Sequence, residues 1–326
     1  MGRKKQTERK HCPVKFLKFK GCFGGNGLAE QKRTLHYIEI PKVVSLSPDS
    51  EASALIRRLD SSLEDPERVV DFRKVERITI RGGLLLRAFR DEFFSCHGVC
   101  PRIRLPKDRK IKTVLQFLGY GDFGMDHSQY DDIDCWDIRS WDANDDFSET
   151  NIPKLIMEEV LPRCYKKEEG LKEMSADLAS AIAEAINNSS EHAYKGKKEN
   201  SKFRKWYLSC GVYPNSNKIM FCVYDKGQGF KDSMTQNSMW GIKNPFEADY
   251  KYIERAAQGI SGTSEKGRGQ GLKTAVAKLG KVNGSVDILS GKGFYSTDSA
   301  KKPRDRKAFI EGSVIAFFVP VKYIEE

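Results

Sequence analysis

The sequence predicts a mixed α/β (α+β) protein with two domains, and three observations support this fold class. The chain has 326 residues, which is more than one hydrophobic core usually serves. Strand and helix patterns alternate through the first part of the chain, up to about residue 125. From about residue 151 a long helix is followed by two strands of the kind that form an antiparallel pair. We therefore expect two α/β domains of different architecture.

The first domain is expected over residues 35–125, after a basic, Gly-rich and largely irregular segment, residues 1–34. Helices are predicted in "SEASALIRRLDSSL", where Ser50 is a candidate N-cap, in "GGLLLRAFRDEFF", and in "KIKTVLQFL", which Gly119 closes. Strands are predicted in "LHYIEIPKVVSLS", "RVVDF" and "PRIRL". This alternation is typical of a small α/β domain.

An acidic and aromatic stretch, residues 126–150, is interpreted as a linker with some local packing, and the second domain is expected over residues 151–326. Its long helix precedes the strands "KFRKWYLSCGVY" and "KIMFCVYD", with "PNSN" as the turn between them. Further helices are predicted in "EADYKYIERAA" and after the glycines of "GRGQGLKTAVAKLG". The segments "GSVDILSGKG" and "GSVIAFFVP" supply two final strands.

The composition, with 39% hydrophobic and 31% charged residues, indicates a soluble globular protein. No apolar run approaches the roughly 20 residues that a bilayer requires, and no signal-peptide pattern opens the chain, so we expect no membrane insertion. Eight cysteines are scattered without a compact framework, which favours free thiols and a cytoplasmic location. The net charge of +11 permits binding to nucleic acid. Much of it lies in the tail "MGRKKQTERKHCPVKFLKFK", where a disordered solubilising arm is the simpler interpretation.

The long helix, residues 178–194, has two contrasting faces. Leu178, Ile182 and Ile186 fall on one side and form a stripe that we expect to face the core. The opposite side carries Glu184, Asn188, Glu191 and His192. This polar side is either a solvated surface or the wall of a site, and the helix alone does not decide between them.

Two glycine-rich sequences extend the possible site. Asp225, Gly227 and Gly229 form a D-x-G-x-G at the end of a strand, which suits close approach of the backbone to a flat ligand. The long polar segment from Lys231 to Lys266 that follows is predicted to be a lid. Either feature alone is common in proteins, so neither identifies a ligand.

The lid segment ends where three glycines, Gly267, Gly269 and Gly271, open a helix. Free backbone N–H groups at a helix start, together with Lys266 and Arg268, would form a cradle for phosphate groups. The spacing matches neither a Walker A loop nor a dinucleotide-binding fingerprint.

The order of these sequences along the chain is more specific than any one of them. An E-x-x-x-N on a helix, a D-x-G-x-G after a strand, a lid, and a G-x-G-x-G-L at a helix start resemble the superfamily of ATPases that contains gyrase, heat-shock chaperones, histidine kinases and MutL. The resemblance covers roughly residues 151–326 and includes the closing strand G-S-x-x-x-F-x-V-P, where the superfamily commonly has Gly-Thr. It implies an α/β sandwich with a mixed, mostly antiparallel sheet.

The resemblance also implies ATP and Mg²⁺ as ligands and assigns roles to the polar residues. Asn188 would be a ligand of Mg²⁺, and Glu184 would be the catalytic general base. Asp225 would accept a hydrogen bond from adenine, and Gly227 and Gly229 would leave room for the ring. The implied ATP-binding residues are Asn188, Asp225, Gly227, Gly229, Lys266, Gly267, Arg268, Gly269, Gly271, Leu272 and Ser313. His192 and Tyr194 also match family positions, although a packing role suits them equally.

The first domain, over roughly residues 36–125, resembles the STAS domains of anti-sigma-factor antagonists. Where that family carries Asp-Ser-Ser-Gly with its regulatory phosphoserine, this chain has Ile80-Arg81-Gly82-Gly83, so the acceptor serine is absent. An unrelated small α/β domain is the alternative.

Three functions are compatible with these resemblances. The first is an ATP-hydrolysing switch, in which lid closure on ATP is transmitted to the STAS-like domain, to a protein partner or across a homodimer. The second is a protein serine/threonine kinase like the anti-sigma factors. The third is a non-catalytic, nucleotide-gated module that binds protein, or nucleic acid through the basic tail. The domain pairing suggests a bacterial regulatory context.

Two other groups of residues have simpler interpretations. Four zinc ligands could come from among Cys96, His97, Cys100, His11, Cys12 and Cys22. Their spacings match no standard zinc finger, so ordinary reduced thiols are favoured. The segment "KKPRDRK" near residue 304 is predicted to be a solvated loop rather than a nucleic-acid-binding element.

Overall fold

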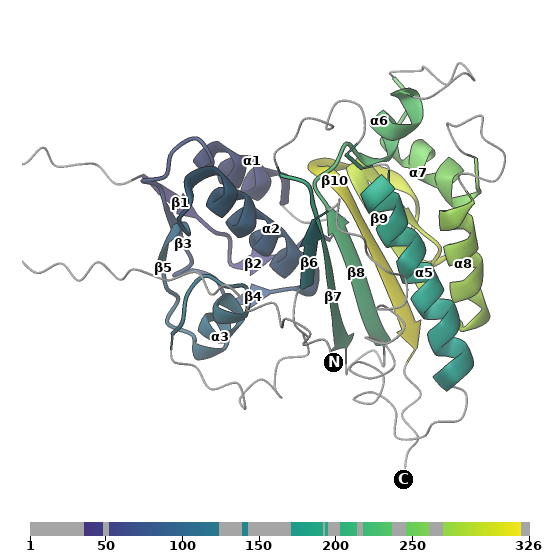
Figure 1. Ribbon diagram of the computed structural model, residues 1–326, viewed down its shortest axis with the longest axis horizontal. Helices are drawn as coiled ribbons and strands as arrows, with labels where there is room; N and C mark the ends of the chain where they lie inside the picture. Colours follow the sequence, from purple (N-terminus) through teal and green to yellow (C-terminus); the bar gives the residue numbers. More distant parts are fainter. Residues whose placement is uncertain are drawn as a thin grey trace, which may run out of the picture.

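The structure of the chain is mixed α/β, as predicted (Figure 1). The computed structural model describes residues 36–47, 52–123, 139–142, 171–191, 193–194, 203–213, 218–236, 246–260 and 270–320. The irregular N-terminal segment, the candidate cap Ser50 and the basic tail fall outside these residues. The roles predicted for these segments therefore stay predictions.

The first half of the chain forms small parallel sheets and three helices. Strands β1 (Tyr37–Glu39), β3 (Val69–Asp71) and β5 (Arg102–Arg104) pair in parallel in the order β1-β3-β5. Two short strands, β2 (Val43–Val44) and β4 (Arg77–Ile78), pair separately. The helices are α1 (Ala52–Ser62), α2 (Ile80–His97) and α3 (Arg109–Phe117). All predicted elements of this half are present, but the single strand predicted in "LHYIEIPKVVSLS" is two strands, β1 and β2, and β4 was not expected.

Local signals explain where two of these helices begin and end. Thr79 caps α2 by accepting the Gly82 N–H, so this helix starts two residues before the predicted stretch. Asp108 caps α3 in the same way. Gly119 follows α3 with a φ of 78°, a left-handed conformation that ends a helix at little cost for glycine.

The second half is built on one five-stranded sheet. Its strands are β6 (Arg139–Asp142), β7 (Lys205–Tyr213), β8 (Lys218–Asp225), β9 (Ser285–Ser296) and β10 (Arg304–Pro320). They lie in the order β6-β7-β8-β10-β9, and every described pairing between neighbouring strands is antiparallel. The helices are α5 (Leu171–Glu191), α6 (Gly229–Gln236), α7 (Asp249–Ala257) and α8 (Gly271–Lys281).

Three elements differ from the sequence predictions. Residues 139–142, expected within the linker, form edge strand β6 beside β7. Within the segment expected to be a lid, α7 matches the predicted helix, whereas α6, which begins at Gly229, was not predicted. The "KKPRDRK" segment is not wholly a loop, because β10 begins at Arg304. Each difference arises from contacts with distant parts of the chain, which local patterns do not encode.

One face of the five-stranded sheet is covered by α5, α7 and α8 (Figure 1). Leu178, Ile182 and Ile186 are at most 1% exposed, so the predicted core stripe of the long helix is confirmed. They pack with outward residues of the strands, among them Phe221 and Phe317.

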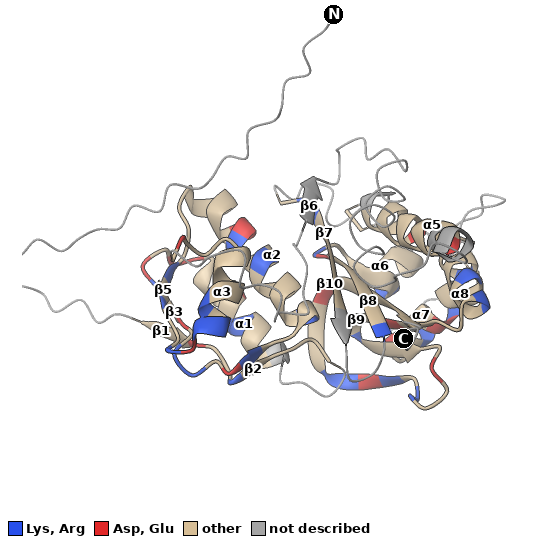
Figure 2. Cartoon of the chain, turned by 90° about the horizontal axis from the view of Figure 1, so that it is seen from below, with Lys and Arg blue, Asp and Glu red and all other residues tan. Residues whose placement is uncertain are grey.

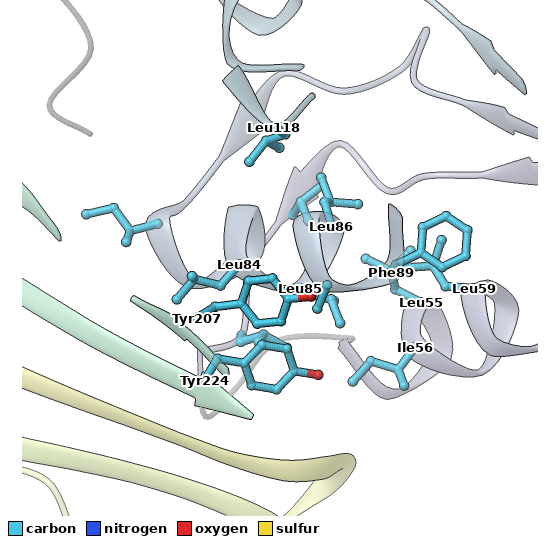
Figure 3. Close-up of a cluster of buried hydrophobic side chains, with 14 of the residues drawn as sticks. Leu55, Ile56, Leu59, Leu84, Leu85, Leu86, Phe89, Leu118, Tyr207 and Tyr224 are labelled. Carbon is cyan, nitrogen blue, oxygen red and sulfur yellow. The ribbon is translucent and has the colours of Figure 1, made fainter. Parts of the chain in front are cut away.

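The other face of the sheet is covered by the first half of the chain. Helices α1 and α2 lie between the small parallel sheet and the large one (Figure 1). Tyr207 and Tyr224 extend from β7 and β8 towards Leu84, Leu85 and Ile56 of these helices (Figure 3). All of these residues belong to one hydrophobic cluster, so both halves share a single core on this side of the sheet.

Buried polar contacts reinforce this junction. Arg81 of α2 donates to Asp287 of β9 at 3.0 Å, and both side chains are largely buried. Asp287 also receives hydrogen bonds from Ser296 and Lys301, which satisfy its remaining acceptor sites. Arg81 occupies the stretch where the STAS resemblance places the regulatory serine, and here that position is part of a buried contact between the halves.

Two properties of the described residues concern membrane and nucleic-acid binding: the hydropathy of the helices and the distribution of basic side chains. Among the described residues, no helix is both long enough and apolar enough to cross a membrane. Lys and Arg residues occur on α1, α3 and α8, towards opposite ends of the molecule (Figure 2).

The shared core predicts that the two halves unfold together. Leu84→Ala on α2, where Leu84 is fully buried, should lower the free energy of unfolding by about 2–5 kcal/mol. All four tryptophans lie beyond residue 125, so their fluorescence reports on the second half. The urea midpoint measured by this fluorescence should fall in the variant. An unchanged tryptophan transition would show that the halves unfold independently.

Candidate functional site

The polar face of α5 meets the first residue of α8. A Cβ placed on Gly271 would clash with the Glu184 carboxylate and would lie 3.8 Å from Nδ2 of Asn188. A side chain at the first residue of α8 would therefore displace the Glu184 carboxylate from its present position. Both Glu184 and Asn188 are half-buried. Three predicted site residues that are far apart in the sequence are thus neighbours in the structure.

Among the described residues, no side chain caps the start of α8. Its N-cap residue, Gln270, makes no side-chain hydrogen bond to the helix end, and its amide instead donates to the Gly259 carbonyl at 3.0 Å. The first N–H groups of a helix have no partner within the helix. Leu272 is buried in the core, so only its backbone could face a ligand. The predicted residues Lys266, Gly267, Arg268 and Gly269 lie outside the described residues.

Asp225 is held by three hydrogen bonds at the end of β8. Oδ1 accepts the Gly227 N–H at 2.8 Å. Oδ2 accepts from Ser313 at 2.5 Å and from Ser189 at 3.0 Å. Ser313 lies directly opposite Asp225 in the β8–β10 register, and Ser189 follows Asn188 on α5. These bonds connect the strand end to the same helix that carries Glu184.

Burial determines the electrostatics of this carboxylate. Asp225 is only 1% exposed, and loss of hydration raises its pKa, although the hydrogen bonds from Ser313, Gly227 and Ser189 oppose the shift. An ionised carboxylate offers about four acceptor sites. The Gly227 N–H and the hydroxyls of Ser313 and Ser189 occupy three of them, and the Ser313 backbone also favours the charged form.

The two glycines after Asp225 are closely packed in the direction a side chain would take. A Cβ on Gly227 would clash with the Cβ and carbonyl oxygen of Ala193, and one on Gly229 would lie 2.5 Å from Ser290 Oγ. Their predicted role beside an adenine ring stays a prediction. Gly229 also has a φ of 75°, which favours glycine. These glycines therefore permit close packing of the loop.

Sequence reasoning missed two residues that shape this loop. Ser189 was not singled out, although it is a polar residue on the same side of the helix as Leu178, Ile182 and Ile186, where a buried hydroxyl needs a partner. Gly312 has a φ of 78°, and a Cβ there would clash with the Asp225 carbonyl oxygen. The glycine before Ser313 is thus required by the close approach of β10 to the end of β8.

Tyr194 has the structural role that was one of its two interpretations. Its ring is buried, and its hydroxyl donates to the Lys205 carbonyl and accepts the Lys226 N–H at 3.3 Å. Burial raises the pKa of this hydroxyl well above its ordinary value, with the charge of Asp225 adding to the effect. The neutral tyrosine hydroxyl therefore connects the backbone at the start of β7 with the backbone just after β8. His192 lies outside the described residues.

The predicted lid segment includes a helix, α7, that is anchored in the core. Tyr252 and Ile253 of α7 are fully buried, and the Asp305 carboxylate of β10 accepts the N–H groups of Asp249 and Tyr250 at 3.1 and 3.0 Å. Lys231 of α6 pairs with Asp249 at 2.8 Å. A lid comprising residues 231–266 as a whole would have to extract α7 from the core. Residues 237–245 and 261–269 are outside the described part.

The possible metal ligands of the chain are the oxygen atoms of the candidate site and the cysteines of the first half. Within the described residues, no group of three or more His, Cys, Asp or Glu side chains is arranged to hold a metal. Asn188 and Glu184 offer oxygen atoms, which suit Mg²⁺ when substrate phosphates and water supply the other ligands. Cys96 and Cys100 form no disulfide, and Arg90 donates to the Cys100 sulfur at 3.4 Å, whereas His11, Cys12 and Cys22 lie outside the described residues.

Comparison with known proteins adds no further identification. No family model matches this chain, and no curated protein sequence matches it. Both family resemblances therefore remain predictions that rest on the sequence motifs.

The packing of α7 predicts its behaviour in hydrogen exchange. The backbone amides of residues 252–257 should be protected in ATP-free protein, because the helix is buried and capped from β10. Adding ATP and Mg²⁺ should change their exchange little. Rapid exchange that slows only with nucleotide would restore the interpretation of the whole segment as a lid.

Proposed function

We propose that the chain is a Mg²⁺-dependent ATP-binding and ATP-hydrolysing switch of the gyrase, heat-shock chaperone, histidine kinase and MutL type. One observation carries the proposal. Helix α5 brings Glu184 and Asn188 against the start of α8 and, through Ser189, also contacts Asp225. The three separate sequence motifs therefore adjoin one helix, as a nucleotide site with a base end and a phosphate end requires.

Asp225 would recognise adenine at the base end. A carboxylate acceptor suits the exocyclic amino group, and burial excludes the water that would compete for it. Hydrogen bonds from the Ser313 hydroxyl and the Gly227 N–H hold the carboxylate in one orientation. A fixed acceptor favours a base that donates at this position.

Glu184 would act at the phosphate end. It would take a proton from water as the water oxygen bonds to the γ-phosphorus and the bond to the ADP oxygen breaks. Asn188, one helical turn later, would help to hold Mg²⁺, which when bound neutralises phosphate charge. The first N–H groups of α8 would hold phosphate oxygens.

The first half is the proposed recipient of the nucleotide signal. It covers the sheet face opposite α5, and it carries Arg81 in place of the STAS phosphoserine. We infer that it communicates by contact rather than by becoming phosphorylated at that position.

Asp225→Asn should weaken ATP binding by about 10- to 100-fold, the effect of losing one hydrogen bond to a charged acceptor. The amide can still accept from Gly227 and donate to the serine hydroxyls, so the fold should persist. Calorimetry measures the affinity. Asp71→Asn, at a buried aspartate in β3, is the matched control and should bind ATP as the wild type does.

The same variant makes a prediction about pH. Because burial raises the pKa of Asp225 in the folded state, its contribution to stability is greatest at low pH and is lost as pH rises through that raised pKa. Thermal denaturation of Asp225→Asn should lack this loss. An equal pH dependence of Tm in both proteins would contradict the electrostatic account.

Two further variants separate catalysis from binding. Glu184→Ala should keep ATP affinity and lose turnover by about 100- to 10,000-fold, whereas Asn188→Ala should lose both. Phosphate release and calorimetry provide the two measurements. Wild-type turnover in Glu184→Ala would remove the general base from the proposal. Phosphate transfer to a partner, without release, would favour a protein kinase, and neither activity would favour a nucleotide-gated module.

A further inference from the structure

Lys226 lies between the proposed adenine acceptor and the next glycine, yet its side chain points to the other half of the chain. Asp225 reaches Ser189 of α5 on one face of the sheet. The neighbouring Lys226 side chain leaves on the opposite face and reaches Asp60 of α1 and Glu92 of α2. The two residues thus connect the candidate site with the helices of the first half.

The Lys226 ammonium is buried in a cluster of three carboxylates. Its side chain is 7% exposed, and Nζ lies 2.5 Å from Glu92, 3.3 Å from Asp60 and 3.6 Å from Glu311. Burial lowers the pKa of this group, but the three carboxylates outweigh that effect and raise it above its ordinary value. An isolated ammonium buried here would cost several kcal/mol, so it depends on these partners.

The backbone of Lys226 has little freedom to move independently of its side chain. Its N–H donates to the Tyr194 hydroxyl at 3.3 Å. Its Cα would lie 2.8 Å from a Cβ placed on Gly312. The loop is therefore packed between α5, β10 and the first half, and a shift of the lysine would move Asp225 and Gly227.

We propose that Lys226 is a positioning residue of the nucleotide site, and that its ion pairs with Asp60 and Glu92 make nucleotide affinity depend on the first half of the chain. This inference rests on the proposed ATP site. By thermodynamic linkage, ATP binding must in turn stabilise the contact of this loop with α1 and α2.

The test measures ATP affinity and turnover in full-length Lys226→Met, Glu92→Gln and the double variant. Lys226→Met should raise the Kd for ATP about 5- to 100-fold, the usual range of coupling between sites. Turnover at saturating ATP should be retained, because Glu184 and Asn188 lie on another element. Glu92→Gln should act in the same direction but less, since Asp60 and Glu311 remain.

The double variant distinguishes a direct contact from general loosening. Its loss of affinity should be smaller than the product of the two single losses, because both substitutions break the same ion pair. Arg81→Met is the matched control, since it breaks another buried ion pair between the halves without touching the loop. It should leave ATP affinity near that of the wild type, and its effect should multiply with that of Lys226→Met.

Each outcome decides the inference. Unchanged affinity in both Lys226→Met and Glu92→Gln would overturn it, as would an equal loss in Arg81→Met. If Lys226→Met does not fold, Glu92→Gln and the double variant, which removes one of the unpaired carboxylates, still provide the comparison. Absence of ATP binding by the wild type would instead overturn the proposed function, so the two failures are distinguishable.

Discussion

Burial of strand β8 on both faces is the constraint on which the rest of the structure depends. Ile219, Phe221 and Val223 pack against the helices of the second half, and the alternate residues pack against the first half. The alternation continues at the last residue of the strand, Asp225, which faces α5, and at the next residue, Lys226, which faces α1 and α2. A polar residue there cannot reach solvent, so it needs a partner. The strand end therefore joins the candidate site to the first half through adjacent residues.

The charges of Lys226 and Asp225 at this strand end are compensated to different degrees by their neighbours. The difference favours Asp225 as the group that would bind a ligand. Lys226 is surrounded by three carboxylates and has no need of another partner. Asp225 receives hydrogen bonds from neutral donors only, so its charge is less well compensated and burial raises its pKa. A ligand that donates to Asp225 would relieve this deficit, whereas one that approached Lys226 would have to displace an existing ion pair.

Local patterns predicted most elements of the second half because these elements are strongly periodic. The alternating residues of β8 and the apolar stripe of α5 both match the structure. Strand β6 was missed because four residues carry little periodicity and form a strand only beside β7. Thr79 and Asp108 are local caps, and sequence could in principle locate them. The contact of Arg81 with Asp287 spans 206 positions, and no local pattern contains it.

The candidate site was predictable in composition but not in geometry. Sequence spacing placed Glu184 and Asn188 on one helix face, since that follows from 3.6 residues per turn. It could not show that Gly227 and Gly229 pack against Ala193 and Ser290, because a glycine is equally compatible with a ligand or with the chain beside it. Asp225 itself is held by Ser313, Ser189 and the Gly227 N–H, all from the second half. The first half reaches this strand end through the adjacent Lys226, so the two halves meet at neighbouring residues whose partners lie far away in the sequence.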